Sequence, residues 1–282
     1  MNNNHFYESS IAGYALALVL HSVGFTLLYK SNRTLPNQRI VTMNLAAAEM
    51  MHCFWQILQQ IMILTQFLSW VIKVGAIEAL FIIMFLNQFF YINIGLIFIL
   101  IIVDRFLYIW LNIKYTVYIT KTKLAIAISF QWLVAAFIAL TPVLLFRYKL
   151  ITGNAYINKV LTTELVLDIF IVSTALLTFT YLFLKVKSFT QQTTSQQGTL
   201  TVLNVWTKLK IPGLMVITFI IFNITSTILK YIYFSLHHTP FVVDIVVTVL
   251  QIIGWWSDAV IYLLVQRRVR RLVSVDGADT VV

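Results

Sequence analysis

The stretch VGAIEALFIIMFLNQFFYINIGLIFILIIVDRFLYI, residues 74–109, determines the architecture expected of this chain. It stays almost entirely apolar until it reaches Asp104-Arg105-Phe106. A helix of about 20 apolar residues spans the hydrocarbon core of a bilayer, so this stretch is long enough to cross a membrane. An acid and an arginine at the end of such a helix are costly to bury unless they pair or serve a function. The stretch therefore predicts a membrane helix that ends in a charged pair.

Similar apolar stretches recur along the whole chain. Of its 282 residues, 60% are hydrophobic and only 11% are charged, whereas the surface of a soluble domain needs many more charged residues. The stretches predict spans at about residues 10–30, 39–65, 73–108, 122–146, 161–185, 208–234 and 241–265. The expected fold is all-α, a seven-transmembrane helix bundle in a single domain, with a short extracellular N-terminus (1–9), the bundle (10–265) and a cytoplasmic tail (266–282).

The distribution of positive charge predicts the orientation of this bundle. The net charge is +10, and most of the 20 Lys and Arg residues fall in loops that alternate spans would place on one side. An excess of Lys and Arg marks the cytoplasmic loops of membrane proteins. We therefore expect the N-terminus outside and the C-terminus inside, in the plasma membrane. Since topology explains the positive charge, no nucleic acid is expected as a partner.

The C-terminal residues 266–273, QRRVRRLV, alternate basic and apolar side chains. Helical spacing would collect Val269, Leu272 and Val273 on one side. This pattern predicts a short amphipathic eighth helix that binds anionic lipids of the inner leaflet. An ordinary basic cluster after the last span fits the pattern equally well.

The residues around the end of the third span resemble a known family. Asp104-Arg105-Phe106 leads through Asn112-Ile113 to Lys114-Tyr115. This run is similar to the rhodopsin-like (family A) G-protein-coupled receptors, whose third helix ends in Asp-Arg-Tyr before a Pro-Leu-Lys-Tyr element. Partial matches to the same family lie on four other spans, at Asn44–Glu49, Trp132 with Pro142, Thr218-Phe219 and Asp258–Tyr262.

The chain also departs from the family pattern, as a divergent receptor would. Its single cysteine, Cys53, rules out an intrachain disulfide. Leu80 falls near the position where the family carries a cysteine at the top of the third helix. The Cys-Trp-x-Pro element of the sixth helix is missing, and Asn223 falls near its tryptophan position. Without the disulfide and the usual sixth-helix element, we expect appreciable basal activity.

The resemblance implies a switch at the cytoplasmic end. In this family, outward movement of the sixth helix frees the arginine, here Arg105, to contact a heterotrimeric G protein. Such a switch needs two packings that are close in free energy. We expect Asp104 to pair with Arg105 beside Phe106, and Tyr181 and Tyr262 to form hydrogen bonds in the open state. Each tyrosine also fits an aromatic anchor at the membrane interface.

Two carboxylates, Glu49 and Asp258, fall in mid-membrane, where an unpaired carboxylate is costly. The resemblance implies that they face each other across the second and seventh spans, where the family binds sodium. Two close carboxylates cannot both ionise cheaply without a cation. Ile94 falls near the position that would complete the sodium shell and cannot ligate, so we expect a shared proton, with His21 as a further partner, and no metal ion. An interhelical hydrogen bond without a signalling role is the alternative.

The ligand pocket is predicted in the outer half of the bundle. We expect Asn87, Tyr91, Asn223 and Thr248 to line it. The amine receptors of the family carry an aspartate near Asn87, so its absence argues against a biogenic amine. Acidic residues such as Glu164 and Asp168 also fall in this half, although charged residues at helix ends are usually just solvated.

Two other classes of protein are weighed against the receptor. A seven-span transporter or channel subunit would use Glu49 and Asp258 as an ion or proton path. Such proteins usually break a helix with Gly or Pro in mid-membrane, and this chain has 9 Gly and 4 Pro. An enzyme is not expected, because no catalytic motif or metal-spaced cluster is present and the five histidines are scattered. No feature of the sequence calls for a cofactor.

Overall fold

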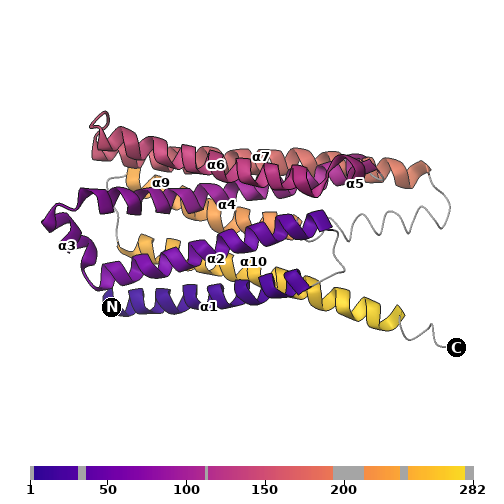
Figure 1. Ribbon diagram of the computed structural model, residues 1–282, viewed down its shortest axis with the longest axis horizontal. Coiled ribbons are helices and arrows are strands. Elements are labelled where there is room, and N and C mark those ends of the chain that lie inside the picture. The colour runs from indigo at the N-terminus through magenta and orange to yellow at the C-terminus, as the bar shows by residue number, and fades with distance from the viewer. Residues whose placement is uncertain (1–2, 31–35, 112–113, 193–212, 236–240, 277–282) are drawn as a thin grey trace.

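The computed structural model describes residues 3–30, 36–111, 114–192, 213–235 and 241–276 (Figure 1). Within these ranges the regular elements are helices and no strand is assigned, as the all-α prediction requires. In chain order they are α1 (Asn3–Lys30), α2 (Pro36–Leu64), α3 (Phe67–Val74), α4 (Ile77–Leu111), α5 (Tyr115–Tyr118), α6 (Lys121–Arg147), α7 (Gly153–Gln192), the π-helical η2 (Ile220–Ile224), α9 (Thr225–Ser235) and α10 (Phe241–Asp276). Residues 213–219 are α-helical and lead directly into η2.

Within the described residues, six helices are long and apolar enough to cross a membrane. They are His5–Lys30, Ile77–Leu111, Lys121–Arg147, Gly153–Lys185, Gly213–Tyr233 and Val242–Ile261. Large apolar side chains cover their outer faces, and Leu133 and Phe137, for example, are 69% and 75% exposed. A soluble protein rarely exposes so much apolar surface. The helices therefore indicate a multi-pass membrane protein.

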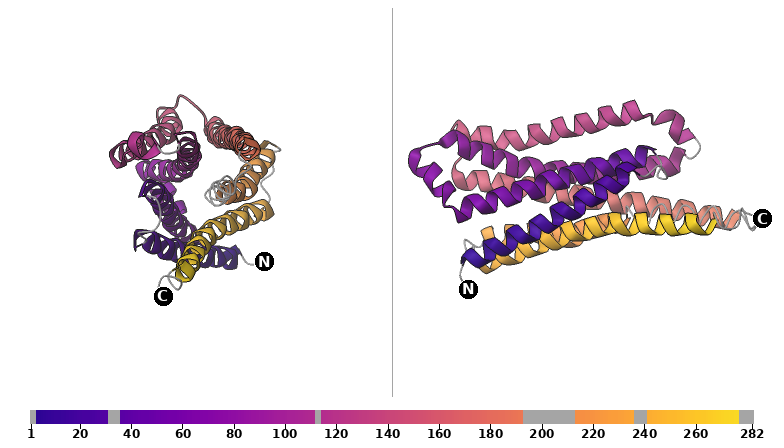
Figure 2. Two further views of the ribbon diagram at one scale, coloured as in Figure 1. Left: turned by 90° about the vertical axis from the view of Figure 1, so that its right-hand side faces the viewer. Right: turned by 60° about the horizontal axis from the view of Figure 1, so that its bottom comes forward.

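The long helices lie side by side in one bundle, which Figure 2 shows end-on. α4 holds the central position, because it packs against α2, α6 and α7, while α1 packs against α2 and α10. The start of α1 and the end of α10 lie at opposite ends of the bundle (Figure 1). We refer to the end that carries α3 (Phe67–Val74) as the α3 end, and to the end that carries α5 (Tyr115–Tyr118) as the α5 end.

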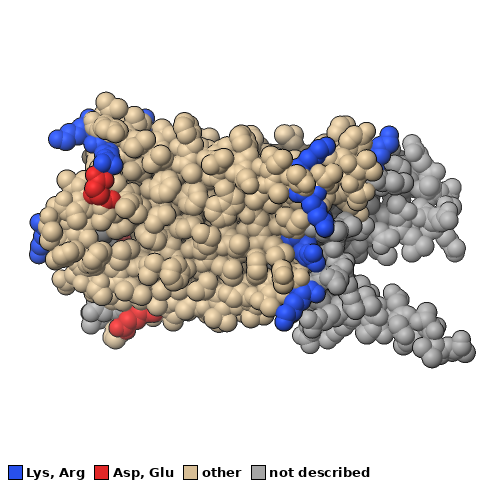
Figure 3. Space-filling view, in the orientation of Figure 1, with Lys and Arg blue, Asp and Glu red and all other residues tan. Residues whose placement is uncertain are grey.

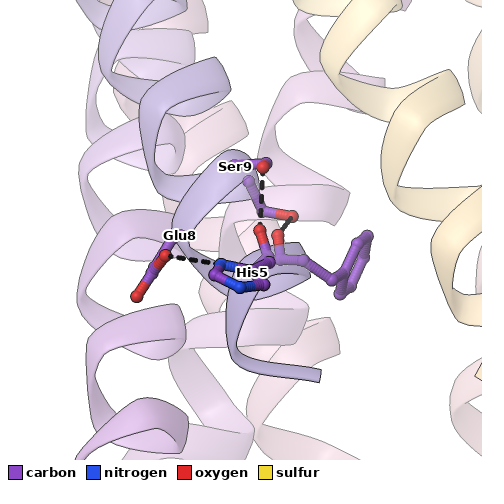
Figure 4. A network of polar contacts seen from close by, with 5 residues as sticks. His5, Glu8 and Ser9 are labelled. Carbon is purple, nitrogen blue, oxygen red and sulfur yellow. Dashed lines mark hydrogen bonds and ion pairs between the residues drawn. The ribbon is translucent and has the colours of Figure 1, made fainter. Parts of the chain in front are cut away.

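The polar first residues belong to the first helix rather than to a separate segment. α1 begins at Asn3, not near residue 10 as predicted. Figure 4 shows its first turns, where Oε2 of Glu8 lies 3.4 Å from Nδ1 of His5 and the Ser9 hydroxyl donates to the His5 carbonyl at 2.8 Å. A pair of polar side chains that interact three residues apart supports a helix. The predicted boundary was wrong because hydropathy marks where a helix is apolar, not where its hydrogen bonds begin.

The third and fifth spans also begin at other residues than predicted. The short helix α3 comes first, and Gly75 follows it with a left-handed φ of 74°. Because glycine has no Cβ, it adopts this conformation easily and lets the chain turn into α4, which starts at Ile77. α7 starts at Gly153 rather than near residue 161 and continues to Gln192.

The C-terminal basic segment extends the last helix. α10 runs unbroken from Phe241 to Asp276, so residues 266–273 continue it rather than form a separate eighth helix. No glycine or proline occurs between Gly254 and Gly277, so the sequence contains no residue that would end the helix there. The prediction of a separate helix is therefore wrong. The side chains of residues 266–273 lie outside the described part of the structure, and their binding to anionic lipids stays a prediction.

Candidate functional site

The charged pair at the α5 end is buried where α4 leaves the bundle. Nη2 of Arg105 donates to Oδ2 of Asp104 at 2.5 Å, and the two residues are 5% and 4% exposed. The other oxygen of Asp104, Oδ1, accepts a hydrogen bond from the hydroxyl of Tyr115 on α5. The guanidinium carbon of Arg105 also lies 5.9 Å from the centre of the Tyr108 ring, within the range of a cation–π contact. The arginine is thus held by its own helix while α5 holds its aspartate.

Tyr115 is a site residue that the sequence interpretation did not assign. Burial raises the pKa of the Tyr115 phenol above its ordinary value, and the hydrogen bond to Asp104 raises this pKa further. The phenol therefore stays protonated and remains a donor. Asn37, in the first turn of α2, also bonds to Tyr115. Its Nδ2 donates to the carbonyl of Ile119 at 2.6 Å. Contacts with both α2 and α4 therefore hold α5 in place.

The remaining residues predicted for the switch are placed less centrally. The Phe106 ring packs against the Tyr181 ring of α7, with centroids 5.3 Å apart. Tyr181 is 40% exposed and lies under Nζ of Lys185. The structure therefore brings Tyr181 to Phe106 and not into a described hydrogen bond with Arg105. Tyr262 lies on α10, but its side chain is outside the described part of the structure.

A second buried cluster crosses the middle of the bundle. His21 of α1 and Glu49 of α2 are both fully buried, with Nδ1 of His21 3.1 Å from Oε2 of Glu49. Glu49 is also hydrogen-bonded to Asp258 of α10. On the far side of Asp258, the Thr218 hydroxyl donates to its Oδ1 at 2.7 Å. The three residues predicted for this cluster are thus brought together, and Thr218 extends it to the helix that leads into η2.

The cluster forms one chain of polar contacts across four helices. It begins at His21, beside Glu49, and ends at the backbone carbonyl of Met215, which accepts from Thr218 at 2.8 Å. Two adjacent carboxyl groups in such a dry site are most cheaply accommodated when they share a proton. The cluster therefore links α1, α2, α10 and the helix before η2, and any movement among them must rearrange these contacts.

A cavity of about 260 Å³ lies at the α3 end, away from Arg105. Three of the four residues predicted for the ligand pocket, Asn87, Tyr91 and Thr248, line it. Other lining residues come from α1, α2, α7, α9 and α10, among them Phe6, His52, Gln60, Glu164, Lys230 and Gln251. The structure thus brings six helices together around one polar cavity, which is the usual form of a ligand site between helices.

Hydrogen bonds fasten the wall of this cavity. The Tyr91 hydroxyl lies 3.0 and 2.9 Å from the two carboxylate oxygens of Asp168 and 2.8 Å from Oγ1 of Thr227. Nearby, Nε2 of Gln88 donates to Oε1 of Glu164 at 3.5 Å. Asp168 is fully buried and Glu164 is 8% exposed. Both acids were considered as solvated residues at a helix mouth, but the structure places them inside the bundle.

Asn223, the fourth residue predicted for the pocket, does not line this cavity in the described structure. It is 4% exposed and belongs to the π-helical segment η2. Its Nδ2 lies against α10, 3.9 Å from where a Cβ on Gly254 would be. A π turn contains more residues than an α turn and changes the phase of the helix. The prediction, which came from the position of the tryptophan in the family's sixth helix, therefore does not hold for Asn223.

A further buried network joins α2, α4 and α6. Nε2 of Gln131 donates to the side-chain and backbone oxygens of Asn93, the latter at 3.1 Å. Nε1 of Trp132 donates to Oδ1 of Asn44 at 2.9 Å. Asn44 in turn donates to Gln131 at 3.5 Å. This network fixes three helices beside the mid-membrane cluster and gives Asn44 and Trp132, two of the motif residues, a structural role.

No protein-family model matches this chain, and no curated protein matches its sequence. The motifs and the geometry of the buried polar sites are therefore what indicate a function.

Proposed function

We propose that this chain is a receptor of the rhodopsin-like G-protein-coupled class. It binds a small extracellular ligand in the cavity at the α3 end and signals to a heterotrimeric G protein at the α5 end. The observation that carries the proposal is the Asp104–Arg105–Tyr115 cluster, which holds a buried charged pair at the end of the central helix. Burying a guanidinium at this place costs free energy. A switch that exposes the guanidinium to a partner gives a reason to keep it there.

The proposed class has seven spans, and we propose α2 as the span that adds to the six apolar helices. The polar residues that lower its hydropathy face the bundle, since Glu49, His52 and Gln60 are at most 8% exposed. Its outward residues are apolar, and Met51 and Phe54 are 46% and 54% exposed. Intramembrane polar residues face the protein interior in spanning helices. α2 therefore meets the requirement of a membrane span although its mean hydropathy is lower.

The charges on the surface support the proposed orientation. On the face drawn in Figure 3, Lys and Arg form a band across the α5 end without visible Asp or Glu, whereas at the α3 end both Lys or Arg and Asp or Glu appear. Lys30 at the end of α1 and Lys121 and Lys123 at the start of α6 belong to the α5 end. Excess positive charge favours a cytoplasmic location for this end. The cavity then faces outward in the plasma membrane, and Arg105 faces inward.

The helix of residues 213–235 is the element that we propose to move. It contains η2, where the α-helical hydrogen-bond pattern is interrupted, and such π turns often occur at functional sites. On the α5 side of η2, Phe219 packs against Phe98 of α4, with ring centroids 4.5 Å apart. On the α3 side, Thr227 bonds to Tyr91 in the wall of the cavity. A ligand that shifts Tyr91 and Thr227 would therefore act on the part of this helix that lies on the α3 side of η2.

The direct experiment measures guanine-nucleotide exchange on a panel of purified G proteins, with the chain reconstituted in lipid nanodiscs. We expect the chain to accelerate exchange and Arg105→Ala to abolish the acceleration. Arg147→Ala is the matched control, because Arg147 is an exposed arginine at the α3 end that pairs with Glu78 at 2.6 Å. Absence of acceleration on every G protein tested would contradict the proposal.

The second candidate is a transporter or channel subunit, and the mid-membrane cluster is the observation that favours it. A chain of polar groups from His21 through Glu49 to Asp258 and Thr218 resembles a proton relay. In liposomes, such a protein would show proton or cation flux that Glu49→Gln abolishes and Arg105→Ala leaves intact. The receptor predicts the reverse pattern, in which exchange depends on Arg105 and no flux occurs.

A further inference from the structure

Acidic side chains outnumber basic ones at the cavity at the α3 end. Glu164 and Asp244 line it, and Asp168 stands directly behind the lining residue Tyr91. Against these three acids the lining contains one lysine, Lys230. Within the described residues Lys230 forms no ion pair within 4 Å of Glu164, although it attracts the Glu164 charge from a greater distance. The formal charges of these residues therefore sum to a negative value, which favours the binding of a cation.

One carboxylate oxygen in the cavity is a hydrogen-bond acceptor that receives no donor. Oε1 of Glu164 receives the hydrogen bond from Gln88, but Oε2 is buried and has no hydrogen-bond partner among the described residues. A carboxylate oxygen can only accept, and a buried charged acceptor without a donor is unfavourable. Oε1 of Gln60, another lining residue, is likewise a buried acceptor without a partner in the described part of the chain. The site therefore needs a molecule that brings N–H or O–H donors.

We propose that this cavity binds a small, polar, positively charged molecule whose ammonium group lies against Oε2 of Glu164. This inference rests on the proposed receptor function, because it names the class of ligand that the receptor would bind. An ammonium group supplies both the missing donor and the missing positive charge. Asp168 strengthens the negative potential from behind, and Lys230 limits the number of positive charges that the cavity accepts.

The size and lining of the cavity restrict the class of ligand further. Its volume of about 260 Å³ is below the range of about 300–1,000 Å³ for drug-sized ligands. Amide side chains contribute much of the lining, from Gln56, Gln59, Gln60, Asn87 and Gln251. Such a surface suits hydroxyl and amide groups better than an aromatic ring. The prediction against a biogenic amine, which came from Asn87, is thus compatible with a polar ammonium compound whose counter-ion stands on α7 instead of α4.

The test uses the cavity itself as a sensor of charge. Thr248→Cys introduces a thiol into the lining, in a background in which the single native cysteine is removed by Cys53→Ala. The reconstituted chain is then treated with two methanethiosulfonate reagents of similar size, one carrying a primary ammonium group, which has N–H donors, and the other a sulfonate. Thr152→Cys, an exposed position between α6 and α7, is the reference outside the cavity. The ratio of the two reaction rates at position 248 is divided by the ratio at position 152.

We expect this normalised ratio to favour the ammonium reagent at least about tenfold, because nearby carboxylates in a confined site concentrate cations. Glu164→Gln, which keeps the shape of the side chain, should lower the ratio at least about threefold, and Lys230→Gln should raise it. The rate with the ammonium reagent should also saturate with concentration, as expected when binding precedes reaction.

Two results would overturn the proposal. One is a normalised ratio at or below one, or a ratio that Glu164→Gln leaves unchanged. The other is a rate that rises linearly with concentration for both reagents, because the cavity would then have a negative potential without binding the cation. Neither result depends on G-protein coupling. If nucleotide exchange is not accelerated but the normalised ratio of reaction rates is high, the receptor function is refuted while the proposed ligand class is retained.

Discussion

Removing one hydroxyl group, in Tyr115→Phe, is predicted to raise basal signalling. The Tyr115 hydroxyl donates to Oδ1 of Asp104, while Oδ2 of the same carboxylate holds Arg105. A hydrogen bond to a charged group contributes about 1.5–3 kcal/mol. If this bond is made only in the closed state, its loss shifts the equilibrium toward the open state by roughly tenfold to a hundredfold.

The assay is basal guanine-nucleotide exchange without ligand, at equal amounts of folded chain. We expect Tyr115→Phe to increase the rate several-fold, until another step limits it. Tyr118→Phe is the matched control, since Tyr118 lies on the same short helix and is 52% exposed, and it should leave the rate unchanged. An unchanged or lower rate for Tyr115→Phe, with normal Tyr118→Phe, would show that Tyr115 does not hold the closed state.

Three further predictions concern the interior of the bundle. Glu49→Ala removes a buried carboxyl that contacts both His21 and Asp258 in a dry site, so the unfolding temperature should fall by an amount that corresponds to about 3–5 kcal/mol, and Glu49→Gln should lose less. Gly254→Ala would place a Cβ 3.0 Å from Cβ of Phe222, so the free energy of unfolding measured with denaturant should fall by about 1–3 kcal/mol. At Gly213 the nearest atoms to an added Cβ lie at 3.6 Å, so Gly213→Ala should lower this free energy less. Replacing sodium chloride by choline chloride should leave the unfolding temperature unchanged, because Glu49 and Asp258 satisfy each other; a rise specific to sodium would contradict the shared proton.

The helices of the bundle were predictable because membrane spans must satisfy their own backbone hydrogen bonds. Apolar length alone therefore indicated most of them, including the central helix that ends just after Arg105. Their ends were less predictable, since polar residues outside the apolar core can continue a helix, as Asn3–Ser9 and residues 266–276 do. The short helix α3 depends on the left-handed backbone at Gly75, which hydropathy does not reveal.

The candidate site was predictable where chemistry is conspicuous in the sequence. Carboxylates such as Glu49 and Asp258 stand out in an apolar helix, and the family resemblance implied that they face each other, with His21 as a further partner. Tyr115 was missed because its role depends on α5 packing against the end of α4. Glu164 was undervalued because sequence position alone does not distinguish a buried acid from a solvated one near a helix end.

The proposed switch can be measured as the distance between the ends of α4 and of the helix that begins at residue 213, both at the α5 end of the bundle. Spin labels at Leu111→Cys and Leu214→Cys, in the Cys53→Ala background, would report this distance in nanodiscs with and without nucleotide-free G protein. We predict that the distance increases when the G protein binds and that Arg105→Ala prevents the increase. A distance that stays the same while the G protein is bound would contradict the switch.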